Sequence, residues 1–154
     1  MEAADWHSID PALQLEAPML RDLLQLWRRK CGERKMPARR DFSPLDLRAH
    51  LGWIVLVDVE TAPFRLRYRL VGTEIVQRVG RDATGRYLDE LYHPEVYDTA
   101  VSAYRRVVAQ KCPLRVHGRM RHAEKGHIAF ESLDLPLSAD GETVSMIMTR
   151  GTFG

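Results

Sequence analysis

The sequence is poor in cysteine, in net charge and in long apolar runs. Its two cysteines, Cys31 and Cys112, are far apart and outside any CxxC or zinc-finger spacing, so neither a disulfide framework nor a metal site is predicted. A formal net charge of +2 is too small to favour a nucleic-acid partner. No apolar run has the length of a membrane span, and residues 1–5 lack the basic and apolar regions of a secretory signal. We therefore expect a cytoplasmic protein without membrane or nucleic-acid partners.

The length and the apolar content predict one substantial core. The chain has 154 residues, of which 45% are hydrophobic. Residues 1–17 show no sustained hydrophobic period and predict a flexible N-terminal arm, which orders only if it docks. Residues 18–43 predict an N-terminal helix followed by a basic loop, and residues 44–154 predict a single folded domain.

The N-terminal helix is strongly amphipathic. Pro18 suits its first turn and Gly32 can end it. Its apolar stripe comprises Leu20, Leu23, Leu24 and Trp27. This stripe must be buried against the chain's own domain or against a second copy, and it is our candidate surface for a homodimer or a partner protein. Between residues 28 and 40 the sequence has many basic residues and a single acidic residue, Glu33. This segment is either a solvated helix end and loop or a surface on which an anionic partner docks.

Hydrophobic periodicity predicts an α+β domain after the basic loop. Three closely spaced strands at the end of the chain exclude a doubly wound parallel sheet, because their turns are too short for crossover helices. We expect a five-stranded antiparallel sheet with helices on one face, in addition to the N-terminal helical extension. The space between sheet and helices can hold a ligand. The predicted strands are 53–59, 64–70, 114–122, 127–137 and 142–153, and the predicted helices are 44–51, 73–80 and 94–111.

Two passages resemble a known family. The segment YRLVGTEI at 68–75, followed by GRDATGRYL at 80–88, is similar to a bacterial branch of the PAS superfamily that contains small stand-alone PAS proteins. Glu131 and the sequence Leu135-Pro136-Leu137 resemble the same branch. The resemblance implies a PAS-like fold and a sensory or signalling role. It leaves the cofactor unknown, because PAS domains bind haems, flavins, small acids, lipids or nothing.

The candidate ligand pocket is predicted from inward strand positions and from the inserted helices. Tyr68 offers a hydroxyl group within an apolar row, and flexible apolar side chains can form the walls. Core packing explains each of these residues equally well. The candidate pocket residues are Tyr68, Ile75, Val79, Met120, Phe130 and Met146.

The sequence gives little support for catalysis or metal binding. Ser132 and Asp134 lie next to Glu131, but neighbours on a strand face opposite sides and no histidine completes a relay. His117 and His122 differ by an odd number, so they also face opposite sides of a regular strand. We therefore predict no catalytic residue and no metal ligand. His93, just before a predicted helix, is either a helix-start residue or a haem ligand of the kind some PAS relatives use.

Three functions remain open from the sequence. The leading hypothesis is a stand-alone PAS sensory module that binds a small ligand, a signalling protein or both, and forms a homodimer. The second is an adaptor whose filled core supports a protein-binding surface. The third is a small enzyme of the isomerase-like cone fold, which requires a carboxylate such as Asp58 or Glu131 in a cavity with a strongly shifted pKa.

Overall fold

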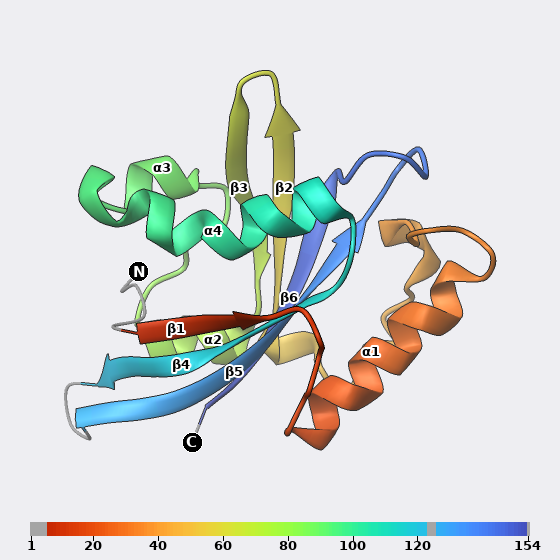
Figure 1. Cartoon of the computed structure of the whole chain (residues 1–154). Helices are drawn as coiled ribbons and strands as arrows, with labels where there is room; N and C mark the ends of the chain where they lie inside the picture. Colours follow the sequence, from red (N-terminus) through yellow and green to blue (C-terminus); the bar gives the residue numbers. More distant parts are fainter. Residues whose placement is uncertain (1–5, 123–125, 154) are drawn as a thin grey trace.

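A six-stranded antiparallel sheet forms the centre of the molecule. The computed structural model describes residues 6–122 and 126–153, without the side chains of residues 6 and 120–122. The strand order is β1-β4-β5-β6-β2-β3 (Figure 1). The strands are β1 (Trp6–Asp10), β2 (Ile54–Thr61), β3 (Phe64–Val71), β4 (Leu114–His122), β5 (Gly126–Leu137) and β6 (Met146–Phe153). The predicted α+β class and its five strands are confirmed, and β1 adds a sixth strand at the edge.

The helices begin and end largely where the sequence predicts. They are α1 (Pro18–Cys31), α2 (Thr73–Val79), α3 (Leu88–Leu91) and α4 (Pro94–Gln110), with 3₁₀ turns η1 (Arg39–Asp41) and η2 (Leu51–Trp53). The predicted helix over 44–51 is wrong. Ser43 and Asp46 do form reciprocal capping bonds, of 2.9 and 3.1 Å, but turns follow instead of a helix. Within the described ranges, no helix has the length and apolar character needed to cross a membrane.

The two faces of the sheet carry different helices. Along β5, Glu131 binds the backbone just before α1, so the odd-numbered residues face α1. Asp134 interacts electrostatically with Tyr104 of α4, so the even-numbered residues face α4. In Figure 1, α4 crosses the strands β2 and β3, whereas α1 lies well apart from α4. The core is therefore built on both faces of one sheet, and a single cluster of buried side chains includes residues from α1, α4 and the strands.

The apolar stripe of α1 is buried inside the chain. Leu20 and Leu23 are 0% exposed, and Leu24 and Trp27 are nearly so. The indole N–H of Trp27 donates a hydrogen bond of 2.9 Å to the carbonyl oxygen of Pro136 on β5. Of the two alternatives that the sequence left open, the structure has the stripe covered by the chain's own domain. These four side chains therefore offer no exposed surface for a homodimer or a partner.

A bulge in the β2–β3 hairpin changes which face Leu70 occupies. Strict alternation from residue 64 predicts that Leu70 shares a buried face with Tyr68. The register shifts between Leu56 and Val57, and Arg69 becomes the extra residue on β3. Leu70 is consequently 40% exposed, whereas Tyr68 is buried.

The segment expected to be a loose arm contains an ordered edge strand. β1 pairs antiparallel with β4, and Ser8 lies opposite His117 in this register. After β1 the chain turns sharply, with the carboxylate of Asp10 accepting the amide hydrogens of Ala12 and Gln14 at 2.9 Å each. Leu13 has a φ of 56°, in the left-handed region that a bulky side chain rarely adopts.

Candidate functional site

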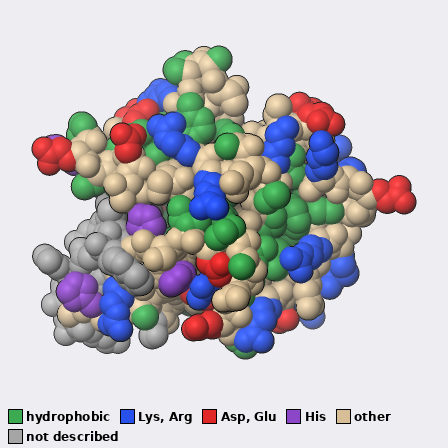
Figure 2. Space-filling model, viewed as in Figure 1, with side chains coloured by type: hydrophobic (Ala, Val, Ile, Leu, Met, Phe, Trp, Pro, Cys, Tyr) green, Lys and Arg blue, Asp and Glu red, His purple; other side chains and the backbone are tan. Residues whose placement is uncertain are grey.

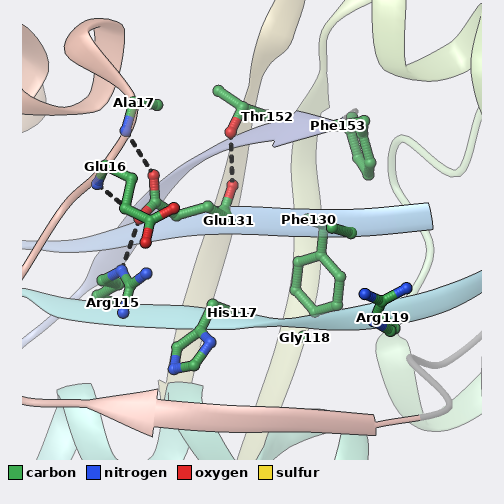
Figure 3. A pocket seen from close by; sticks show the side chains of 11 residues that line it. Glu16, Ala17, Arg115, His117, Gly118, Arg119, Phe130, Glu131, Thr152 and Phe153 are labelled. Carbon is green, nitrogen blue, oxygen red and sulfur yellow. Dashed lines mark hydrogen bonds and ion pairs between the residues drawn. The ribbon is translucent and has the colours of Figure 1, made fainter.

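An arginine on β4 connects the N-terminal segment to the sheet. The Arg115 guanidinium donates to the carboxylate of Glu131 at 2.6 Å and to that of Asp10 at 3.2 Å. Glu131 also accepts the amide hydrogens of Glu16 and Ala17, both at 2.9 Å (Figure 3). We call the side chains of Asp10, Arg115 and Glu131, with these two amides, the Arg115 clasp. The clasp holds the end of β1, the start of α1 and the two neighbouring strands β4 and β5 together.

The charges in the clasp stabilise one another. Burial alone would raise the pKa of Glu131, but the two amide hydrogen bonds and Arg115 together hold this pKa below its usual value. The amide of Gln14 lowers the pKa of Asp10 most, burial opposes it, and the amide of Ala12 and Arg115 add smaller effects that keep this pKa below its usual value. Both carboxylates are therefore ionised at neutral pH. A glutamate that is held ionised by three donors is poorly suited to act as a general acid or base.

An open hollow of about 460 Å³ lies beside the clasp. Arg115, His117 and Arg119 alternate along one face of β4, and Glu131 and Thr152 lie opposite them on the neighbouring strands. Figure 3 shows Phe130 and Phe153 further along the strands from Glu16 and Ala17, and their register places both rings on the face opposite Glu131. The complete lining is Glu16, Ala17, Arg115, His117, Gly118, Arg119, Ala129, Phe130, Glu131, Thr152 and Phe153. This hollow therefore combines basic side chains with the walls of the clasp.

A second polar group of side chains is buried on the opposite face, under α4. The Thr149 hydroxyl donates to the Asp134 carboxylate at 2.8 Å, and Tyr104 lies beside this pair. Burial raises the pKa of Asp134 to about 7, although the bond from Thr149 acts in the other direction. Burial also raises the pKa of Tyr68, which interacts with Tyr92 in the same layer. No cation balances Asp134 among the described residues, so this carboxyl group resists ionisation.

The structure does not bring the predicted pocket residues together. Tyr68 and Ile75 are buried, but Val79 is 44% exposed. Phe130 lines the hollow beside the clasp. Met146 pairs with Leu137, which places it on the α1 face of the sheet and away from Tyr68. The side chain of Met120 lies outside the described residues.

Two of the histidines, His50 and His93, have structural roles. The Nδ1 atom of His93 accepts the amide hydrogen of Glu95 at 3.2 Å, which caps α4 and agrees with the helix-start alternative. His50 is buried and its Nδ1 atom accepts a hydrogen bond of 3.0 Å from Arg150. Over residues 6–122 and 126–153, no three His, Cys, Asp or Glu side chains are grouped to hold a metal ion.

The basic segment is partly neutralised within the chain. Lys30 pairs with Asp46 at 3.0 Å, and Arg34 pairs with Asp41 at 2.8 Å. Figure 2 shows Lys and Arg side chains spread over the part of the surface where α1 lies in Figure 1. Arg28 is among the exposed residues of this segment. The segment thus acts in part to attach the end of α1 to the loop that follows it.

Several site residues were missed from the sequence. The alternation of Arg115, His117 and Arg119 on a predicted strand was a usable signal for a basic row on one face. A usable signal for Asp134 was its place between Leu133 and Leu135, where one polar residue interrupts a buried strand. The clasp had no local signal, because Asp10 and Glu131 are separated by most of the chain.

Comparisons with known proteins give a family and a fold. A family model described as PAS domain matches residues 15–150. Among solved structures, the chain is similar to an RNA-binding light-oxygen-voltage receptor, with 15% sequence identity and a TM-score of 0.51. The match covers 97% of this chain and 39% of that receptor chain, so this chain spans well under half of its length. At this identity the likeness shows the fold alone. No curated protein matches the sequence.

Proposed function

This chain belongs to the PAS-domain family, and we propose that it is a sensory module that binds a small organic anion in the hollow beside the Arg115 clasp. The observation that carries the proposal is that the hollow and the clasp share residues. Arg115, Glu131 and the backbone of Glu16 and Ala17 line the hollow and also hold the N-terminal segment. A ligand in the hollow therefore contacts the groups that fix β1 and α1, and its binding alters how firmly they are held.

The chemistry of the lining favours a small anion. Arg119 lies on the same face as Arg115, and the carboxylate of Glu131 in the same lining is already engaged by three donors. An added carboxylate or phosphate would find a charged donor in Arg119. The volume of about 460 Å³ is within the range of small-molecule sites.

Native mass spectrometry of freshly purified protein, with an absorbance scan, is the direct test. We expect the wild-type chain to retain a small molecule, whose mass and spectrum identify it. Arg119→Glu should reduce the bound fraction at least about tenfold, because one lost charge-assisted hydrogen bond and a new repulsion each weaken an anion. Arg48→Glu is the matched control, because Arg48 is exposed and lies outside the hollow.

Because a weakly bound ligand is lost during purification, the same variants are also compared by thermal shift with a library of small carboxylates and phosphates. A wild-type shift that survives Arg48→Glu and disappears in Arg119→Glu supports the hollow. Equal shifts in both variants would place the binding elsewhere. The absence of any retained molecule and of any shift would refute the proposal.

An adaptor without a ligand is the second candidate. It is favoured by the dense packing under α4, where Leu66, Tyr68 and Val107 are at most 2% exposed. In this role the chain presents a surface to a signalling protein, and its core only supports that surface. A catalytic role has less support, because Glu131 is held ionised by the clasp and Asp58 is paired with Arg67 and Arg69.

A further inference from the structure

The N-terminal strand is joined to the domain in a way that allows it to be exchanged. β1 pairs along one edge, with β4, and it lies before the residues that the PAS-domain model matches. The first fixed point after it is Leu15, whose side chain is buried in the core, and the amide of Glu16 next to it is held by Glu131. The four residues 11–14 therefore form a hinge, and when extended they span about 14 Å.

The hinge is strained when β1 pairs with β4 of its own chain. Leu13 has a φ of 56°, which costs free energy for any side chain with a Cβ atom and most of all for a bulky one. The closed turn also depends on Asp10, which accepts two amide hydrogens of the hinge as well as a hydrogen bond from Arg115. If the hinge extends, Leu13 relaxes, and water replaces the two amide hydrogen bonds of the exposed turn.

The edge of β4 pairs best with a strand that carries a carboxylate opposite Arg115. Without β1, five residues of β4 lose their backbone partners, and such an edge pairs readily with another extended segment. Arg115 selects that segment, because it lies opposite Asp10 and needs a carboxylate there. The β1 strand of a second copy has the same backbone register and places the same carboxylate against Arg115.

We infer that two copies of this chain exchange their β1 strands, so that each copy's Asp10 completes the partner's Arg115 clasp. The exchanged dimer keeps every β1–β4 hydrogen bond and every ion pair of the clasp, and it relieves the strain at Leu13. Strained short hinges favour this kind of exchange. The inference goes beyond the proposed ligand site and is independent of it, since no ligand takes part.

A disulfide trap distinguishes exchange from other modes of association. Ser8 and His117 are direct partners across β1 and β4, at a spacing that suits a disulfide. In a Cys112→Ser background, the double variant Ser8→Cys and His117→Cys is oxidised at several protein concentrations without added ligand. Exchange predicts a covalent dimer whose share rises with concentration, as seen on a non-reducing gel and by mass spectrometry. Glu60→Cys with Arg65→Cys is the control pair, because its strands are joined by a tight hairpin and its disulfide stays within one chain.

A hinge variant tests the physical cause. Leu13→Gly removes the penalty for positive φ, so dimerisation measured by native mass spectrometry should weaken at least about tenfold. Wild-type protein that stays monomeric at all concentrations, or a trap disulfide that forms only within one chain, would overturn the inference. A non-covalent dimer that leaves the trap intramolecular would also overturn it, because the copies would then associate without exchange.

Discussion

Replacing Asp134 by asparagine removes a buried carboxyl group while keeping its hydrogen bond. The Thr149 hydroxyl donates to Asp134 at 2.8 Å, and an asparagine oxygen can accept the same bond. The variant therefore isolates the effect of ionisation under α4. It leaves the size of the side chain almost unchanged, so no cavity is created.

The pH dependence of this variant follows from the shift in the pKa of Asp134. Burial raises that pKa from 3.8 to about 7, so the folded chain binds the proton more tightly than the unfolded chain. Its contribution to stability is full below pH 3.8 and is lost as the pH rises toward 7. At about 1.4 kcal/mol for each pH unit, the wild-type protein loses about 3 kcal/mol between pH 5 and pH 8.5 from this group alone. The Asp134→Asn variant loses none of this free energy, because asparagine does not titrate.

Urea unfolding at pH 5, 6, 7 and 8.5 measures the difference. The free energy of unfolding of Asp134→Asn minus that of the wild-type protein should rise by about 3 kcal/mol across this range. Other titrating groups cancel in the difference because both proteins contain them. A difference that stays constant with pH would show that Asp134 ionises freely in the folded chain, and the account of its burial would be refuted.

Three further predictions concern other parts of the fold. Glu131→Gln should lower the free energy of unfolding by about 3 kcal/mol in urea, because it removes one charge of a buried ion pair; a change below about 0.5 kcal/mol would contradict the clasp. Burial and then Arg150 lower the pKa of His50, so wild-type stability should fall as the pH drops below 6.5, and His50→Asn should lack this loss in thermal unfolding at pH 7 and pH 5. Gly72→Ala would place a Cβ atom within van der Waals overlap of the Gly52 backbone oxygen, so we expect severe destabilisation and little folded protein by circular dichroism, whereas a wild-type spectrum and melting curve would disprove the close approach.

The sequence predicts most helices and strands because their signals are local. Pro18 and Pro94 begin the two long helices, and apolar residues recur at the helical period after each of them. The turn containing Asp140 separates β5 from β6 as predicted. Each of these signals lies within a few residues of the structure it specifies.

Features that depend on distant contacts were not predicted. β1 has no clear alternation, and its ordering depends on β4, more than a hundred residues later in the chain. The amphipathic period of α1 shows that a face is buried but does not say what covers it. The bulge at Arg69 arises from the pairing of two strands, so alternation within β3 alone placed Leu70 on the wrong face.

Both faces of β5 pack against helices, and this limits where the chain can gain or lose residues. Leu133 and Leu135 face α1 while Asp134 faces α4, so inserting or deleting one residue within β5 would reverse all three. The carboxyl group would then meet the apolar side of α1, and leucines would meet the polar group beside Thr149. The outer part of the turn between β5 and β6, residues 139–143, lies outside the paired strands and is largely exposed, so it has no such restriction. We expect natural length variation to collect there, and engineered tags or loops to be accepted there in preference to β5.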